Sequence, residues 1–397
     1  MRILNIQLDI LQTAGLASFL YFLGSKIKSH VNILKKYFIP APVIGGLLFS
    51  LLIFIGEKTG LYYFEMNAVL QDFFMNLFFT AVGFECSIAI VKKSGILGLK
   101  LAVIAIFLLV LQNLVGVSLT NLFGLNPLLG VAMGSTAMSG GVGSAVAFGP
   151  DFEALGASGG TTIGTAAATF GLLVGSMIGG PVAKRLIDKK KLKTNNLGIE
   201  IEKNEDVEKN VLNKSSFLNS FLLVVFAGAL GSIISVLLNS TGLKFPYYVG
   251  CLFAGAIIRN IADYKNSKIN IEEIGIVSNF SLNLFLSMAL MQLSIAKIVS
   301  LALPMFVILL AEAALMAIYA YFVTFKTCGG DYEAAVMAAG HCGVGLGQTP
   351  NAIANMTAVT EQHGPAPTAW FVLPVITVIF INIFNPIIIT AFMNILS

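Results

Sequence analysis

Long apolar runs recur along this chain, and short polar stretches separate them. Each run has the length of about 20 residues that an α-helix needs to cross a hydrocarbon core. None of the runs shows the period of two that is typical of membrane barrel strands. The first run follows one basic residue and has no small-residue cleavage site, which favours a retained helix over a signal peptide. The pattern predicts ten membrane spans, at 8–26, 39–56, 72–91, 97–119, 161–183, 217–238, 245–262, 277–296, 301–323 and 368–393.

Composition supports the same class of protein. Hydrophobic residues make up 56% and charged residues 11% of the 397 positions, whereas soluble domains carry about 25% charged residues. The chain is therefore predicted to be an all-α polytopic membrane protein surrounded by lipid, with no nucleic-acid partner. Its four cysteines have no CxxC spacing, so neither a disulfide framework nor a zinc site is expected.

The placement of basic residues predicts the orientation of the chain. With the N-terminus outside, 20 of the 24 basic residues fall on the inner side and 4 on the outer side. The stretch 184–214 holds 15 of the 44 charges and is predicted to be a solvated linker. Long loops count little under the positive-inside rule, but without the nine basic residues of this linker the count is still 11 against 4. Both termini should face outward, and the linker should face the cytoplasm.

Two semi-polar segments, about 127–152 and 333–356, lie between the predicted spans. They contain "GSTAMSGGVGSAVAFG" from Gly134 and "GHCGVGLGQTPNAIANM" from Gly340. Irregular backbone at membrane depth is tolerated only within protein or beside a water-filled cavity. Broken helices there expose amides that favour anions and carbonyls that suit Na⁺. The hydroxyl and amide residues beside the glycines are therefore candidate ligand groups: Ser139, Ser144, Thr349, Asn351 and Asn355.

Glycine and serine also permit close helix packing. The paired placement, the proline and the polar density of the two segments favour a ligand site over packing. By contrast, "GTAAATFGLLVGSMIGGP" (Gly164–Pro181) repeats small residues at helical spacing and is predicted to be a packing face.

The two halves of the chain resemble each other. "NLFFTAVGFECSIA" from Asn76 and "NLFLSMALMQLSIA" from Asn283 share six of fourteen positions. "IPAPVIGGLL" and "FPYYVGCLF", and "GGVG" and "CGVG", recur at nearly the same separation. Five spans in each half would invert the second copy, as in many secondary transporters. We therefore expect a first repeat at 1–183, the cytoplasmic linker 184–214, and a second repeat at 215–397.

Several other residues are candidates for a role within the membrane. Carboxylates there are costly and usually functional. Glu85 lies close to Lys92 and so near the interface, whereas Glu312 is deeper. Glu312 could handle the ammonium group of a substrate, a proton or a cation, or could be a structural, hydrogen-bonded carboxyl. Gln112 and Asn113 occupy the corresponding place in the first half. Asn76 and Asn283 recur in both repeats and are predicted to bond across helices.

The motifs "GHCGVGLGQTPNAIANM", "MSGGVGS" and "ATFGLLVGSMIGGPVA" resemble the bacterial sodium/glutamate symporters. "IPAPVIGGLL", "LQNLVGV" and "SLALPMFVILL" extend the likeness over nearly the whole chain outside the linker. The resemblance implies Na⁺-coupled uptake of L-glutamate across the bacterial inner membrane, with Na⁺ as coupling ion and no other cofactor. It also implies a homodimer and an elevator mechanism, in which a domain with two re-entrant hairpins slides against a static one.

The resemblance also implies a set of site residues. It makes Gly140, Gly141 and Gly143, and likewise Gly343, Gly345 and Gly347, the hairpin tips. One departure is Val142, which stands where the family often has a histidine, so no role is carried over to that side chain. The predicted substrate-binding residues are Ser139, Gly140, Gly141, Gly143, Ser144, Gly343, Gly345, Thr349, Asn351, Asn355 and Glu312. Those predicted to ligate Na⁺ are Ser139, Gly345, Thr349 and Asn351.

Three alternatives stay open at this stage. A Na⁺-coupled carrier of citrate or malate would have the same architecture. A channel could use two glycine loops as a selectivity filter. An intramembrane hydrolase could use Ser139 as nucleophile and His341 as base, although Ala137 breaks the GxSG pattern and an inverted repeat would be unexplained. A zinc site at His341 and Cys342 has too few ligands.

Overall fold

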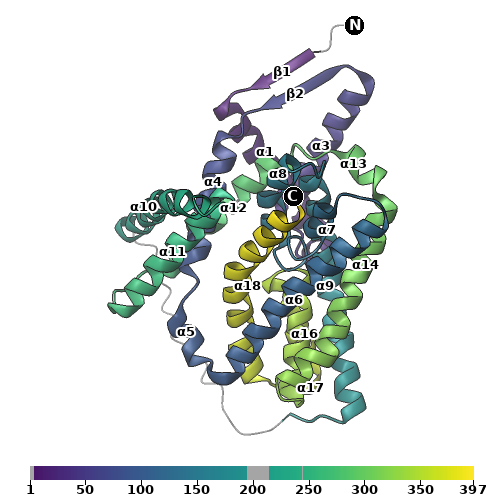
Figure 1. The fold of residues 1–397 in the computed structure, drawn as a ribbon, viewed down its shortest axis with the longest axis vertical. Helices are drawn as coiled ribbons and strands as arrows, with labels where there is room; N and C mark the ends of the chain where they lie inside the picture. Colours follow the sequence, from purple (N-terminus) through teal and green to yellow (C-terminus); the bar gives the residue numbers. More distant parts are fainter. Residues whose placement is uncertain (1–3, 195–213, 244) are drawn as a thin grey trace.

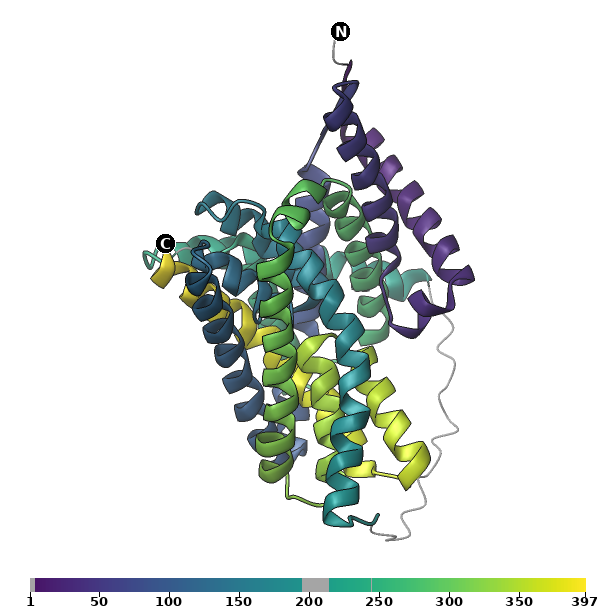
Figure 2. The same cartoon turned by 90° about the vertical axis from the view of Figure 1, so that its right-hand side faces the viewer.

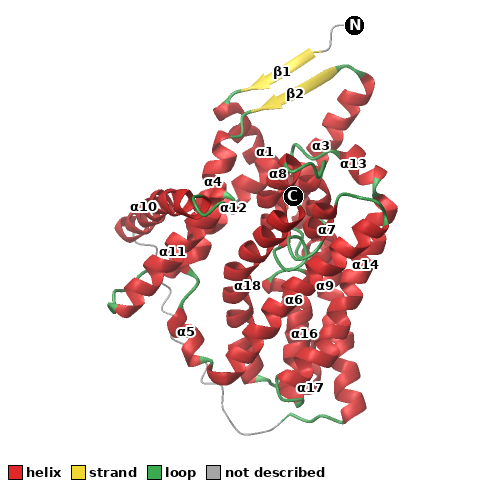
Figure 3. Cartoon of the chain, in the orientation of Figure 1, coloured by secondary structure: helices red, strands yellow, loops and turns green. Residues whose placement is uncertain are grey.

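The computed structural model describes residues 4–194, 214–243 and 245–397, and helices dominate it (Figure 3). Most of the predicted linker, 195–213, lies outside the described residues. The helices are α1 (Ile10–His30), α2 (Asn32–Lys36), α3 (Ala41–Thr59), α4 (Val69–Phe84), α5 (Ile88–Lys93), α6 (Gly95–Leu122), α7 (Pro127–Met133), α8 (Gly141–Ala154), α9 (Gly160–Lys190), α10 (Lys214–Asn239), α11 (Tyr247–Tyr264), α12 (Ile271–Leu290), α13 (Ile295–Ser300), α14 (Ala302–Tyr319), a π-helical stretch (Ala320–Thr324), α15 (Phe325–Thr327), α16 (Tyr332–Leu346), α17 (Thr349–His363) and α18 (Pro367–Leu396).

Eight described helical segments are long and apolar enough to cross a membrane. They begin in α1, α4, α6, α9, α10, α12, α14 and α18. The other two predicted spans also coincide with helices. The apolar part of α3 is shorter, and α11 carries an ion pair of Arg259 and Asp263. The structure thus supports a multi-pass membrane protein, whereas the number ten stays a prediction.

A small parallel sheet was missed by the sequence analysis, which predicted helices only. β1 (Leu4–Leu8) pairs with β2 (Tyr62–Met66), and Leu4 lies opposite Tyr62. β2 alternates between exposed and half-buried side chains, as expected for a short strand with one protected face. The two strands lie at the N-terminal end of the molecule in Figure 1.

The helices form two bundles, which we name by their members. The outer bundle contains α1, α3, α4, α10, α11 and α12, which contact one another extensively. The hairpin bundle contains α6, α7, α8, α9, α14, α16, α17 and α18. The bundles meet where α8 faces α12, and α13, which follows α12 in the chain, contacts both α9 and α3. Figure 2 shows α1 and α3, in purple, on the side of the molecule away from α6 and α14.

Two helical hairpins coincide with the two semi-polar segments. The first hairpin consists of α7 and α8, and the second of α16 and α17. The side chain of Asn126 caps α7, and that of Asp331 caps α16. Such caps satisfy backbone amides that a helix start leaves free. Figure 1 shows the labels of α7 and α8 above those of α16 and α17, so the hairpins occupy different levels of the same bundle.

The predicted packing face on α9 is confirmed. Gly171, Gly175 and Gly179 lie one turn apart and face the second hairpin. A Cβ on Gly171 would lie 2.2 Å from the carbonyl oxygen of Leu346, and one on Gly179 would lie 2.5 Å from that of Ala339. Only glycine allows the backbones of α9 and α16 to approach this closely.

Candidate functional site

The first hairpin is broken between α7 and α8, where the chain runs through Gly134–Gly140. The backbone amide of Ser135 donates to the side chain of Asn113 on α6 over 2.9 Å. Asn385 of α18 donates to the carbonyl of Ser135 over 3.1 Å. Gly141 then begins α8 with a φ of +68°, a value that favours glycine. Side chains from α6 and α18 therefore fix the shape of this break.

The second hairpin turns more tightly. α16 ends at Leu346, and α17 starts at Thr349 with Pro350 in its first turn. Gly347 is therefore at the tip, whereas Gly343 and Gly345 lie in the last turns of α16. A Cβ on Gly343 would lie 2.3 Å from the backbone nitrogen of Ala352, so this glycine lets the two arms of the hairpin cross closely.

The two hairpins are joined by a buried set of hydrogen bonds. Gln112 of α6 donates to the carbonyl oxygen of Gly345 over 2.7 Å. The Ser139 hydroxyl lies 2.7 Å from Oε1 of Gln112 and 3.3 Å from the same carbonyl oxygen. Because Gln112 is completely buried, the break of the first hairpin and the end of α16 are held in a fixed relation.

A pocket of about 270 Å³ lies where the hairpin tips meet the outer bundle. This is close to the volume of roughly 300 Å³ at which ligand pockets begin. The hairpin bundle supplies Ser139, Gly140, Val344, Gly347, Gln348, Thr349, Pro350, Val378, Ile381 and Asn382. α4 and its C-terminal end supply Phe78, Val82 and Glu85, and α12 supplies Gly275, Ser278, Asn279 and Leu282.

The polarity of this pocket suits a ligand with anionic groups. The N-terminal ends of α8 and α17 both lie at it, and neither has a side-chain cap among the described residues. Helix starts carry a positive partial charge, although the amides of Gly141 and Asn351 already donate to the carbonyls of Ala137 and Gln348. A larger cavity, of about 630 Å³, adjoins Glu361 and Trp370 at the start of α18, but neither hairpin tip reaches it.

The structure brings some of the predicted residues to the pocket and not others. Ser139, Gly140 and Thr349 line it directly. Gly141 lies beside Gln348, and Gly143 faces Phe78 and Leu282, so both are adjacent to the wall. Ser144, Gly343, Gly345, Asn351, Asn355 and Glu312 do not line it.

Asn351 and Asn355 connect α17 to α9. Asn351 donates to the carbonyl of Leu172 over 2.7 Å. Asn355 donates to the carbonyls of Gly175 and Ala339 over 2.8 and 3.2 Å. Both side chains are buried, and the Oδ1 atom of Asn351 has no partner among the described residues. Their visible role is to anchor the second hairpin.

Glu312 lies on α14 and is completely buried. Neither of its carboxylate oxygens has a hydrogen-bond partner in the described part of the chain. An isolated buried carboxylate is costly, so this group needs a proton or a cation there. Its neighbour one turn along, Met316, packs against Gly345, which puts Glu312 near the hairpins but behind the pocket wall.

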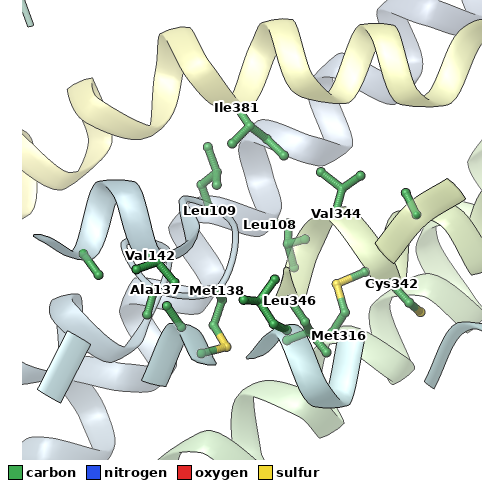
Figure 4. Packing of buried hydrophobic residues seen from close by; sticks show 14 of the residues in the cluster. Leu108, Leu109, Ala137, Met138, Val142, Met316, Cys342, Val344, Leu346 and Ile381 are labelled. Carbon is green, nitrogen blue, oxygen red and sulfur yellow. The ribbon is translucent and has the colours of Figure 1, made fainter. Parts of the chain in front are cut away.

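Val142, the departure from the family motif, is a core residue. It is 0% exposed and packs among the apolar side chains of both hairpins. Figure 4 shows Val142, Ala137 and Met138 on one side and Val344 and Leu346 on the other, with Leu108 and Leu109 between. A valine here thus belongs to the apolar core around the hairpins.

The hydrolase alternative is not supported by the geometry. Ser139 bonds to Gln112 and to the carbonyl of Gly345, while Nδ1 of His341 pairs with the Thr324 hydroxyl over 2.8 Å. The proposed nucleophile and base are therefore not hydrogen-bonded to each other, as that mechanism requires. The four cysteines are free thiols, and the described residues contain no cluster suited to a metal ion.

Five polar residues of the wall were not assigned to the ligand site by the sequence analysis, although Glu85 was among its candidates for a role within the membrane. They are Glu85, Ser278, Asn279, Gln348 and Asn382. Gln348 lies inside a quoted motif and could have been included on that ground. The others come from α4, α12 and α18, and only the folded arrangement brings them to the hairpin tips.

The chain is similar to known proteins along nearly its whole length. The sequence pattern of the sodium/glutamate symporter family matches residues 6–365. The chain is 38% identical over 393 residues to proteins named sodium/glutamate symporter from Escherichia coli (strain K12) and Shigella flexneri. These alignments cover 97% of this chain and 98% of each relative. The chain belongs to the sodium/glutamate symporter family.

A more distant family member comes from Haemophilus influenzae (strain ATCC 51907 / DSM 11121 / KW20 / Rd). It is 33% identical over 381 residues, and the alignment covers 94% of both chains. Membership confirms the predicted family and the prediction that the chain is a transporter rather than an enzyme. It also makes Na⁺ the ion to be accommodated. As a member of a symporter family with eight candidate membrane helices, the chain is a multi-pass membrane protein.

Proposed function

We propose that this chain carries L-glutamate together with Na⁺ across the membrane, with the substrate bound in the pocket between the two hairpin tips. The observation that carries the proposal is the meeting of two uncapped helix starts, those of α8 and α17, at one pocket. Glutamate has two carboxylates, and each helix start can accept one. The Thr349 hydroxyl and the Gln348 amide add hydrogen-bond donors beside them, whereas the Ser139 hydroxyl, which donates to Gln112, offers an acceptor oxygen.

The coupling ion needs oxygen ligands close to this pocket. Of the proposed Na⁺ ligands, Ser139 and the Gly345 carbonyl adjoin each other, and Asn351 has a free buried Oδ1. A second group of oxygens surrounds the break of the first hairpin, where Ser135 Oγ, Thr136 Oγ1 and Asn385 Oδ1 are buried without partners in the described chain. Hard cations prefer such oxygen ligands, and a bound cation would reduce the charge that the substrate brings.

Alternating access by two inverted repeats is the architecture we propose. The series α4, α5, α6, α7, α8 and α9 has a counterpart in the series α12, α13, α14, α16, α17 and α18. A second polar cavity, of about 290 Å³, also lies between the bundles, where Gln71 and Thr162 meet Gln292. Gln292 is the repeat partner of Glu85, which lines the first pocket. Two cavities at related positions suit a site that opens alternately to either side.

The remaining features of the proposal follow from sequence and family. The hairpins are re-entrant, ten helices span the inner membrane, and the termini face outward. The hairpin bundle moves as an elevator against the outer bundle, which forms the homodimer. The division into repeats at 1–183 and 215–397 belongs to the same proposal, although α9 continues to Lys190, within the charged segment 184–214.

Uptake into proteoliposomes tests the function directly. The purified chain is reconstituted, an inward Na⁺ gradient is imposed, and labelled L-glutamate is followed against an equal K⁺ gradient. We expect accumulation with Na⁺ only, reduced by unlabelled L-glutamate and not by citrate. Citrate or malate uptake without glutamate uptake would overturn the substrate but keep the architecture. Flux that neither saturates nor requires Na⁺ would indicate a channel.

A further inference from the structure

One ionisable side chain, that of Glu85, lines the pocket between the hairpin tips among the described residues. Glu85 is the residue directly after α4, and its side chain is exposed. No hydrogen bond or ion pair of its carboxylate is found in the described part of the structure, although Arg259 lies close enough to donate to the carbonyl of Phe84. Arg259 instead pairs with Asp263 over 2.9 Å.

The position of Glu85 is unfavourable for the stability of α4. The C-terminal end of a helix carries a negative partial charge, so a carboxylate there is repelled. The fold does not require the charge, because the second repeat has Gln292 at the matching place. Glu85 therefore has neither a partner nor a structural reason for its charge in the described structure.

The distribution of charge around the pocket complements an amino acid with two carboxylates. The positive ends of α8 and α17 lie on the side of the hairpins, and the negative end of α4 with Glu85 lies on the side of the outer bundle. We propose that Glu85 binds the ammonium group of the substrate and so selects amino dicarboxylates over dicarboxylates that lack the amino group. This inference rests on the proposed function and adds a specificity residue to it.

Glu312 is less suited to the same role. It was predicted as a candidate for the ammonium group, but it is fully buried on α14 and does not line the pocket. Glu85, by contrast, lines the same pocket as Ser139 and Thr349 of the hairpin bundle. Charged hydrogen bonds are the stronger class, so one such contact can determine the preference of the site.

The test compares L-glutamate with glutarate, which has the same carbon chain and both carboxylates but no amino group. Thermal stabilisation of the purified full-length chain is titrated with each ligand in Na⁺. The wild type should bind glutamate at least about tenfold more tightly than glutarate. Glu85→Gln should weaken glutamate binding about ten- to thirtyfold and leave glutarate binding unchanged or tighter, so that the preference disappears.

Two further variants and one baseline complete the experiment. Asp72→Asn removes another carboxylate from α4 outside the pocket and should leave the preference intact. Glu85→Asp keeps the charge on a shorter side chain and should give an intermediate preference. Without ligand, Glu85→Gln should melt at the wild-type temperature or above, because it removes a repelled charge.

Several results would overturn the inference. The inference is wrong if Glu85→Gln keeps the wild-type ratio of glutamate affinity to glutarate affinity. This holds both when the two affinities fall together and when neither affinity changes. If Glu85→Gln changed only the Na⁺ concentration required for glutamate binding, Glu85 would be assigned to the ion and not to the ammonium group. Loss of folded protein in both Glu85 variants would show a structural role. If the wild type itself does not bind glutamate with Na⁺, the proposed function fails first, and the two failures are thus distinguishable.

Discussion

The Ser139 hydroxyl contacts both hairpins, since it lies at the break of the first and reaches the Gly345 carbonyl of the second. Ser139→Ala removes this contact, the bond to Gln112 and one hydroxyl of the pocket wall. We expect glutamate affinity to fall about five- to tenfold, as for the loss of one or two hydrogen bonds. Uptake measured over a range of glutamate and Na⁺ concentrations checks this.

Ser144 supplies the matched control for that measurement. It is the same residue type five residues later, in the first turn of α8, but it does not line the pocket. Ser144→Ala should leave both concentration dependences within about twofold of the wild type. An equal loss of glutamate affinity in Ser139→Ala and Ser144→Ala would contradict the assignment of Ser139 to the pocket wall.

Individual residues differ in how far the sequence identified them. Ser139 and Thr349 were found because they sit beside glycine turns, in motifs whose polarity contrasts with the apolar flanks. Asn351 and Asn355 belong to the same motif, yet they anchor α17 to α9 and do not line the pocket. A short motif indicates that polar groups are needed, but the direction of each side chain depends on helix packing that one sequence does not reveal.

At the scale of elements, the interface of α9 with the second hairpin depends on a row of glycines. Gly179 and Gly180 are adjacent in α9 but face different surroundings. A Cβ on Gly179 would lie 2.3 Å from the side-chain nitrogen of Asn355, whereas one on Gly180 meets nothing within 4 Å. Gly179→Ala should therefore destabilise the protein by about 1–3 kcal/mol through overpacking.

Gly180→Ala should be neutral or stabilise by about 0.5–1 kcal/mol, because alanine favours the helix. Thermal unfolding of both variants in detergent checks the pair, and uptake shows whether the hairpin has shifted. A destabilised Gly180→Ala variant with an unaffected Gly179→Ala variant would mean that α9 is rotated relative to the described packing.

The elements themselves were largely predictable, because apolar runs of membrane length favour one structure. The exceptions have physical causes. β1 and β2 are too short for a clear pattern, and they form only because the ends of α1 and α3 bring them together. α9 continues beyond the predicted span to Lys190, since lysine-rich turns remain helical where they are solvated.

At the scale of the whole molecule, the candidate site depends on an interface that the sequence did not predict. Each bundle contains helices from both halves of the chain. The outer bundle combines α1, α3 and α4 with α10, α11 and α12, and the hairpin bundle contains both hairpins. The pocket lies between these bundles, and ten of its 17 lining residues come from outside the hairpin motifs. A single sequence indicates that the two halves resemble each other, but not how their helices pack together.

Movement between the bundles would have to break the contacts that now join them. Lys297, in α13, donates to the hydroxyl of Ser158 beside α9, and Ser294 donates to Thr162 over 3.1 Å. Both contacts connect the α12–α13 region to the start of α9. If transport requires the hairpin bundle to slide, a covalent link at this point should stop net uptake.

Ser158→Cys combined with Lys297→Cys, joined by a short bifunctional maleimide, tests this prediction. The four native cysteines are buried and should react slowly. We expect uptake to fall at least about tenfold after cross-linking, with little change in either single variant.

A matched pair within the hairpin bundle, Thr194→Cys with Pro365→Cys, joins residues that are hydrogen-bonded over 3.1 Å. Cross-linking this pair should leave uptake intact, because its members move together. Full uptake by the cross-linked first pair would exclude sliding along this edge and would require the pocket to open by movement of the hairpin tips alone.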